Sequence, residues 1–209
     1  MMNILVVGST GPQGREFVAQ ALAAGHSVRA LARKPSALQS VQGLEVVRGD
    51  VFDQPSLDAA ARGQDAAVVM LGISLAAARK PTNVFSQGTR NLIAALKPAG
   101  VRRLIVQSSF GVGDSRRHAG LPERVIYALL LRGAYADKEF QEQAVRESTL
   151  DYTIVRPTRL TMGPGTGATP PASTLAALRA TAADAAWVRR PARRAGLIRA
   201  GRGIARGLV

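Results

Sequence analysis

Short apolar runs alternate with longer helical patterns along most of the chain, from residue 3 to about residue 156. Runs of this kind, at regular spacing, are typical of βαβ units whose parallel strands are buried on both faces. The expected strands are residues 3–7, 27–32, 44–49, 66–71, 103–108 and 152–155, and the expected helices lie at about 12–24, 54–62, 83–99 and 135–147. The alternation therefore predicts an α/β fold with a doubly wound parallel sheet.

The length of 209 residues favours one domain with a substantial core. No run of eighteen uncharged apolar residues offers a membrane span, and the N-terminus lacks the basic segment and cleavage site of a secretory signal. The chain contains no cysteine and two histidines, which excludes disulfides and thiolate metal sites. We expect a soluble, cytoplasmic protein without a bound metal or a membrane partner, either a monomer or a weak dimer.

The last part of the chain differs in composition from the rest. Residues 163–209 hold eight arginines and one acid among Ala, Gly, Leu, Pro and Thr, and carry about half of the formal net charge of +14. We therefore divide the chain into a domain at 1–162 and a basic tail at 163–209. The tail is interpreted as a solvated appendage, with two alternatives: an arm that binds nucleic acid, or GC-rich coding sequence read in a shifted frame.

Three glycines lie between the first expected strand and the first expected helix. In the order of the chain they are Gly8, Gly11 and Gly14, in a GxxGxxG pattern. A loop of this kind allows a tight turn, a close approach of the backbone to a pyrophosphate, and close packing of helix on strand. Its placement predicts a dinucleotide site, although three glycines alone would also suit a purely structural turn.

The charges after the second strand indicate which dinucleotide is bound. An NAD site usually has an acid about 20 residues after the glycines, to hold the ribose 2′-hydroxyl. No acid occurs between Glu16 and Glu45, and Arg33 and Lys34 stand at the strand end instead. Two cations at that place suit a 2′-phosphate, so NADP(H) is preferred over NAD(H).

Several segments together carry a family resemblance. The segments GSTGPQGREFVAQALAAGHSVRALARKPSAL, VVRGDVFD, VVMLG, GTRNLIAALKPAGVRRLIVQSS and VRESTLDYTIVRP follow one another as in atypical short-chain dehydrogenases/reductases. The chain resembles the NmrA-like group and, within it, the biliverdin IXβ/flavin reductases, over residues 2 to about 162. The resemblance implies a Rossmann-like NAD(P)-binding domain.

The resemblance also implies which residues hold the cofactor. They are Thr10, Gly11, Pro12 and Gln13 at the pyrophosphate, Arg33 and Lys34 at the 2′-phosphate, Asp50 and Val51 at the adenine, Leu71 and Gly72 at the adjoining ribose, Ser108 and Ser109 near the nicotinamide, and Pro157 and Thr158 at the nicotinamide and substrate end. Relatives usually continue with a segment that covers the site, and none follows Gly167. We therefore expect residues 168–209 to be poorly ordered or weakly helical around 175–188, and the substrate pocket to be incomplete or rebuilt.

Candidate catalytic residues are Ser108, Ser109, Tyr135 and Lys138. Short-chain dehydrogenases pair a Tyr with a Lys four residues later, whereas Tyr135 stands three before Lys138. The sequence leaves open a displaced pair, a Lys138 that holds the ribose, and a surface pair of Lys138 with Glu142. Asp137, Glu139 and Glu142 are interpreted as a solvated helix face, and residues 111–122 as a loop that could cover the site.

Three functions are compatible with these residues. The first is an NADPH-dependent oxidoreductase that transfers hydride to a small acceptor such as a flavin or quinone, with the two serines donating hydrogen bonds. The second is a non-catalytic NAD(P) sensor or scaffold of the NmrA type, which the missing Tyr–Lys spacing favours. The third is nucleic-acid contact through the tail.

Overall fold

The structure of the protein is a computed structural model that describes residues 1–39, 41–157, 159–161 and 179–181. Strands and helices alternate in it along the chain, as the sequence predicts. The strands are β1 (Asn3–Val7), β2 (Ser27–Ala32), β3 (Leu44–Arg48), β4 (Ala66–Val69), β5 (Arg103–Gln107), β6 (Asp151–Val155), β7 (Arg159–Thr161) and β8 (Arg179–Thr181). The helices are α1 (Pro12–Ala23), α2 (Gln54–Ala61), α3 (Leu75–Ala78), α4 (Val84–Leu96), α5 (Leu121–Leu130) and α6 (Arg132–Glu147), with 3₁₀ turns η1 (Pro35–Ala37) and η2 (Gly113–His118).

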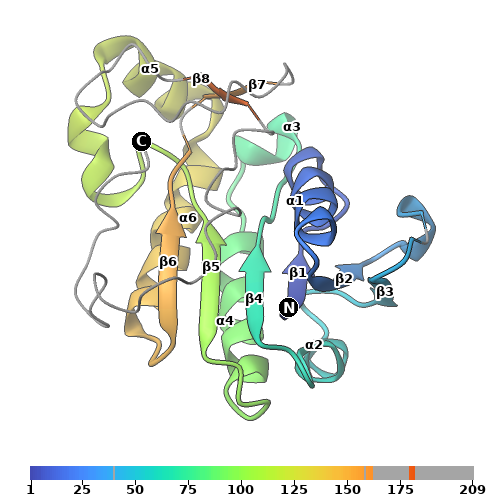
Figure 1. Ribbon diagram of the computed structural model, residues 1–209. Coiled ribbons are helices and arrows are strands. Elements are labelled where there is room, and N and C mark those ends of the chain that lie inside the picture. Colours follow the sequence, from blue (N-terminus) through green and yellow to red (C-terminus); the bar gives the residue numbers. More distant parts are fainter. Residues whose placement is uncertain (40, 158, 162–178, 182–209) are drawn as a thin grey trace, which may run out of the picture.

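Within the described residues, the main sheet has six strands in the order β3-β2-β1-β4-β5-β6. Every pairing between neighbouring strands is parallel, and β1, β4, β5 and β6 are seen to point the same way in Figure 1. The strand order reverses between β1 and β4, which is the topological switch point of a doubly wound sheet. A Rossmann-like fold is therefore confirmed, and its ligand site is expected at the carboxyl ends of the strands beside this switch point.

The two faces of the sheet are both covered, which explains the continuous apolar runs. Along β1, alternate side chains point to opposite faces: Leu5 and Val7 belong to one apolar cluster, and Ile4 and Val6 to another. The first cluster is completed by residues of α2, α4 and α6, namely Leu57, Leu92, Leu96 and Val145. The second is completed by residues of α1, namely Phe17, Val18 and Ala21. None of the helices in these described parts is long and apolar enough to cross a bilayer.

The structure differs from the sequence-based expectations at four places. Helix α6 begins at Arg132, three residues before the predicted start, and residues 121–130 form a helix, α5, that the sequence analysis did not predict. The expected loop at 111–122 contains η2. Of the helical stretch predicted around 175–188, residues 179–181 form β8, paired in parallel with β7. The rest of that stretch and Thr158 lie outside the described residues, and the division of the chain at residue 162 stays a prediction.

Helix α6 is buried along the side that packs on α4, where a solvated face was expected. Asp137 and Glu142 are 3% and 0% exposed, and of the three predicted surface acids only Glu139 is exposed. The Asp137 carboxylate accepts hydrogen bonds from the backbone N–H groups of Phe85 (2.8 Å) and Ser86 (3.3 Å). These groups belong to the first turn of α4 and have no intrahelical partner. Asp137 therefore caps α4 from another helix, which a reading of α6 by itself could not reveal.

Removing this cap is expected to destabilise the fold. Asp137→Ala leaves two buried N–H groups without an acceptor, and we expect a loss of about 1–3 kcal/mol in the free energy of unfolding. Glu139→Ala, two residues away and exposed, should change it by less than about 0.5 kcal/mol. Urea denaturation of both variants measures the difference, and equal stabilities would contradict the capping role.

Candidate functional site: the predicted nucleotide site at the carboxyl edge of the sheet

The glycine-rich loop between β1 and α1 is shaped by backbone contacts that leave no room for side chains. Gly8 has a φ of +91°, and a Cβ built on it would lie 2.3 Å from the carbonyl oxygen of Met70, which follows β4. A Cβ on Gly14 would lie 2.2 Å from the carbonyl oxygen of Gly8. These two glycines therefore allow α1 to begin close against β1 at the switch point.

Gly11 differs, because the protein's own packing does not require a glycine there. Its φ is −72°, and a Cβ on it would make an ordinary contact of 3.6 Å with the carbonyl oxygen of Gly8. Gly11 is the N-cap residue of α1, so a side chain on it would stand beside the first-turn N–H groups, which have no intrahelical partner. A bare backbone at this helix end fits a phosphate group, which those N–H groups and the helix dipole attract.

The end of β2 is tied to this loop by hydrogen bonds. Ser9 Oγ donates to the carbonyl of Leu31 (3.1 Å), and the Arg15 guanidinium donates to the carbonyls of Thr10 (3.0 Å) and Ala37 (2.7 Å). The predicted cofactor residues after β2, Arg33 and Lys34, lie between those anchors and are exposed, as are Thr10 and Pro12. Among the described residues neither cation takes part in an ion pair.

Arg15 is a site residue that the sequence analysis missed. It is exposed and directly follows the third glycine, in the first turn of α1. Its bonds hold the glycine loop and the segment after β2 together, so a third cationic side chain lies near the two predicted cations. A basic residue immediately after the third glycine is the signal that could have identified it.

The residues predicted at the adenine and its ribose lie at the ends of β3 and β4. Asp50 follows β3, and its carboxylate accepts from the N–H of Phe52 (2.9 Å). Val51 is buried, and its carbonyl accepts from the Asn91 side chain on α4 (2.8 Å). Leu71 and Gly72 follow β4, half-buried and exposed respectively. All four residues lie at the same edge of the sheet as the glycine loop.

Gln13 joins the glycine loop to β5. Gln107 Nε2 donates to Gln13 Oε1 (2.7 Å), which bridges the switch point between α1 and the end of β5. Behind it, Lys138 Nζ donates to the Gln107 carbonyl (3.2 Å) and lies 4.3 Å from the ring centre of Phe85. Burial lowers the pKa of Lys138 to about 8, against the opposing effect of nearby carboxylates. Lys138 is 7% exposed, so the expected surface pair with Glu142 is wrong.

Tyr135 and Lys138 do not form a hydrogen-bonded pair. The Tyr135 hydroxyl donates to the carbonyl of Phe110 (2.9 Å), while Lys138 is bonded to a different carbonyl. Burial raises the pKa of Tyr135, and the neighbouring Tyr127, whose ring stacks on it at 4.5 Å, adds to the rise. A raised pKa opposes the phenolate form that a Tyr–Lys pair uses.

A buried carboxylate, Glu142, joins three segments next to the expected nicotinamide end. It accepts from Ser108 Oγ (2.6 Å), from Arg156 Nε (2.8 Å) and Nη2 (2.6 Å), and from Arg146 Nη2 (2.7 Å). Arg156 also donates to Asp114 in η2. Burial raises the pKa of Glu142, but the hydrogen bonds from Arg156 and Ser108 and the two positive charges outweigh it, so the net shift is downward.

The two predicted serines, Ser108 and Ser109, differ in burial and in whether their hydroxyl groups bond to this network. The Ser108 side chain is buried and its hydroxyl proton is used by Glu142, whereas Ser109 is half-buried. Pro157 is also half-buried, and its carbonyl accepts from the N–H of Phe110 (3.0 Å). The network therefore fixes the chain segments on both sides of the place expected for the nicotinamide.

A cavity of about 380 Å³ lies between α5, α6 and the segment after β5. Its lining residues are Gly111, Arg116, Tyr127, Ala128, Arg132, Tyr135, Ala136 and Glu139. Because Gly111 comes shortly after β5, the cavity lies on the carboxyl side of the sheet. Its volume is within the range of small-molecule sites.

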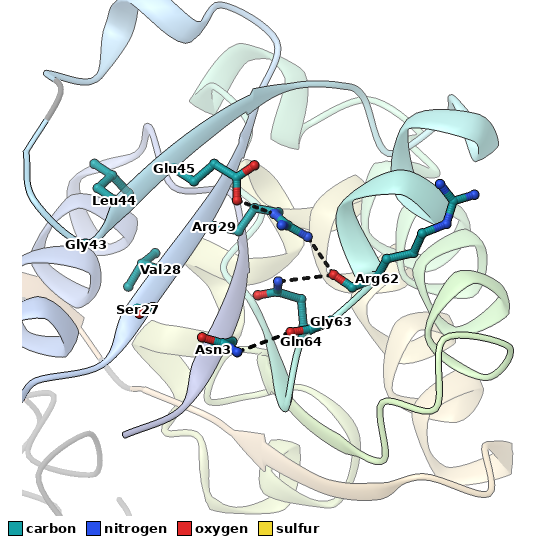
Figure 2. Close-up of a pocket in the computed structure, with 10 residues that line it drawn as sticks. All are labelled: Asn3, Ser27, Val28, Arg29, Gly43, Leu44, Glu45, Arg62, Gly63 and Gln64. Carbon is teal, nitrogen blue, oxygen red and sulfur yellow. Dashed lines mark hydrogen bonds and ion pairs between the residues drawn. The ribbon is translucent and has the colours of Figure 1, made fainter.

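A second hollow, of about 430 Å³, lies at the opposite edge of the sheet (Figure 2). It is lined by the beginnings of β1, β2 and β3 and by the chain after α2, which includes Arg62. Arg29, the cation inside it, donates to Glu45 and to the carbonyls of Ala60 and Arg62. Its donors are thus used within the protein, and the hollow is remote from the glycine loop.

Comparison with known proteins agrees with this geometry. Residues 8–188 match the NAD(P)H-binding family. The chain belongs to this family. It is 36% identical over 155 residues to a (4-alkanoyl-5-oxo-2,5-dihydrofuran-3-yl)methyl phosphate reductase of Streptomyces griseus, a match that covers 74% of this chain and 46% of the relative. An uncharacterised chloroplastic protein of Arabidopsis thaliana is 28% identical over 172 residues, which are 79% of this chain and 61% of that relative. The chain therefore spans about half to three-fifths of these relatives.

Solved structures are similar over most of the chain. The oxidoreductase ylbE of Lactococcus lactis superposes with a TM-score of 0.74 at 25% identity, covering 88% of this chain and 81% of that one. ChuY of Escherichia coli O157:H7, described as an anaerobillin reductase, has a TM-score of 0.71 at 26% identity, with 88% and 87% covered. Together with the family match, they confirm the predicted resemblance to NmrA-like, atypical short-chain dehydrogenases and reductases.

Alanine substitutions in the glycine loop should separate packing from ligand binding. Gly14→Ala forces backbone atoms apart, and we expect it to lower the free energy of unfolding by about 1–3 kcal/mol. Gly11→Ala should change stability by less than about 1 kcal/mol and yet weaken nucleotide binding at least tenfold. Thermal unfolding and nucleotide titration measure the two effects; a Gly11→Ala variant that binds as tightly as the parent would contradict the assignment.

The Glu142 network predicts a dependence of stability on pH. A carboxylate whose pKa is lowered by folding stabilises fully above its unfolded pKa of about 4.3, and the stabilisation is lost as the pH falls through the folded value. Glu142→Gln should therefore be much less stable than the parent at pH 7, with a smaller difference at pH 3.5. Glu147→Gln, exposed on the same helix, is the control. A difference that stays constant between these pH values would refute the network's role.

Proposed function

We propose that the protein is an NADPH-dependent oxidoreductase that transfers hydride to a small acceptor such as a flavin or quinone. The observation that carries the proposal is the bare backbone at Gly11, where the protein's own packing needs no glycine, next to the exposed cations after β2. Membership of the NAD(P)H-binding family and the reductases among its relatives support it.

The preference for NADPH rests on charge. A 2′-phosphate brings nearly two negative charges to the end of β2, where Arg33 offers a planar fork of donors and Lys34 a point charge. Arg15 fixes the position of this segment relative to the glycine loop through its bonds to Thr10 and Ala37. NADH lacks the phosphate and would leave both cations without an ionic partner.

The protein's part in the reaction is to bind and orient. The bound nicotinamide supplies a hydride, so that NADPH, a proton and the acceptor give NADP⁺ and the reduced acceptor. The Glu142 network holds the segments at Ser108 and Arg156, and Ser109 offers a hydroxyl beside them. The Tyr135 hydroxyl donates its proton to the Phe110 carbonyl and so does not offer it to an acceptor in this geometry; the completing proton would then come from water. Orientation of a hydride donor is the main requirement of such reductions.

A non-catalytic NAD(P) sensor or scaffold is the second candidate function. The observation in its favour is that Tyr135 and Lys138 bond to separate carbonyls instead of forming a catalytic pair. Nucleic-acid contact through the basic tail, the third alternative, concerns residues that are almost all outside the described part of the chain.

Cofactor preference gives a direct test. Each charge-assisted contact contributes about 1.5–3 kcal/mol, so Arg33→Ala should weaken NADPH binding roughly ten- to a hundredfold. NADH binding should not change. Arg62→Ala, an exposed arginine at the opposite edge of the sheet, is the matched control. Equal affinities of the parent for the two nucleotides, or an equal loss for both in Arg33→Ala, would refute the preference.

Catalysis is tested by following NADPH oxidation at 340 nm with a panel of flavins and quinones. The proposal predicts turnover with at least one acceptor, and slower turnover with NADH at the same concentration. Tight NADPH binding without oxidation by any acceptor would favour the sensor.

A further inference from the structure

Helix α5 carries an unusual concentration of exposed apolar side chains. Four of the nine exposed large hydrophobic residues in the described part of the chain lie on this ten-residue helix. They are Leu121 (76% exposed), Val125 (55%), Ile126 (48%) and Leu129 (69%). Spacings of three and four residues place them on one side of a helix, so they form a continuous apolar stripe.

The other side of α5 faces the cavity on the carboxyl side of the sheet. Tyr127, which lies off the stripe, lines that cavity, and its ring stacks on Tyr135 of α6. Ala128, at the margin of the stripe, lines the cavity as well. In Figure 1, α5 lies at the margin of the molecule, at the end of the sheet toward which the strands point. A surface that bound to the stripe would therefore be separated from the cavity by one helix.

Cations flank the stripe at both of its ends. Arg116 and Arg117 precede α5 in η2 and Arg132 follows it, and all three are exposed. Two acids lie near these arginines in the described part of the chain. Glu139 forms an ion pair with Arg116 (Nη1 to Oε1, 3.9 Å), and Asp114 is paired with Arg156. An apolar helical face between arginines has the composition of a helix that lies in the interface of an anionic bilayer.

We propose that the exposed face of α5 docks on an anionic lipid surface and brings the cavity to an acceptor dissolved in the bilayer. The acceptor part of this inference rests on the proposed reductase function. The proposal replaces the expectation that the chain has no membrane partner. It is compatible with the absence of a spanning helix among the described residues, because such a helix lies along the membrane plane.

The charges argue against two other occupants of the stripe. A second copy of the chain, paired through α5 about a twofold axis, would bring one set of arginines against another. The chain's own tail at 163–209 carries eight arginines and one acid, so it has the same sign of charge. An anionic surface is the occupant that complements both the apolar stripe and its flanks.

Co-sedimentation of the full chain with lipid vesicles tests the docking. We expect binding to vesicles that contain phosphatidylglycerol, little binding to phosphatidylcholine alone, and release at high salt. Val125→Asp should weaken binding at least tenfold. Val41→Asp, which changes a valine of similar exposure (49%) outside the stripe, should bind as the parent does.

The charge contribution is tested by a second pair of variants. Arg116→Gln combined with Arg117→Gln should weaken binding to anionic vesicles about 25-fold, at about fivefold for each arginine. Arg102→Gln, which changes an exposed arginine before β5, should leave binding unchanged. The proposal would be overturned if Arg102→Gln weakened vesicle binding as much as the Arg116→Gln/Arg117→Gln double variant does. Absence of binding of the parent to anionic vesicles at low salt would overturn it too. A dimer in sedimentation velocity that Val125→Asp dissociates would also overturn it, since the stripe would then be a contact between copies.

The reductase function is measured separately, with a water-soluble quinone. Val125→Asp should oxidise NADPH with this acceptor at the parent's rate, and more slowly with a quinone held in anionic vesicles. Turnover of the soluble quinone without vesicle binding would overturn the docking and leave the proposed function intact. Vesicle binding without turnover of either quinone would support the docking and contradict the reductase function and the delivery of an acceptor.

Discussion

The close approach of α1 to the end of β1 is the contact on which the rest of the site depends. A Cβ on Gly14 would lie 2.2 Å from the Gly8 carbonyl oxygen, so only a glycine lets the helix begin where it does. That placement points the free N–H groups of α1 at the switch point of the sheet, and it lets Gln13 reach Gln107 on β5. The segments predicted to hold the pyrophosphate and the nicotinamide are thereby fixed relative to each other.

The two ends of the predicted nucleotide site are stabilised by different interactions. At the β2 end, the exposed side chains of Arg33 and Lys34 form no ion pair with the described residues, which suits a ligand that supplies the negative charge. At the β5 end, the charges of Glu142, Arg156, Arg146 and Asp114 neutralise one another within the protein. In the proposed binding mode, the first arrangement would select NADPH over NADH, and the second would form a rigid wall beside the nicotinamide.

The positions of the six main strands and of most helices along the chain could be predicted from the sequence, because strands buried on both faces are almost continuously apolar. The glycine loop and the cations after β2 could be predicted from spacing alone. The buried charges of α6 could not: Asp137, Lys138 and Glu142 resemble a solvated face until α4, β5 and Arg156 are packed against them. Helix α5 was not predicted because its large apolar residues lie exposed. Arg15 was not predicted because it contacts the backbone carbonyl of Ala37, which is distant in the sequence.

In the proposed complex, a nicotinamide dinucleotide lies along the carboxyl edge of the sheet with its pyrophosphate at the start of α1. Titration of the isotopically labelled protein with NADPH, followed by the NMR shifts of its backbone amides, tests this most directly. We expect the largest shifts at Thr10, Gly11 and Gln13, with smaller ones in the segments that follow β2 and β5. Shifts confined to Asn3, Gly43 and Gly63, in the hollow at the opposite edge of the sheet, would contradict it.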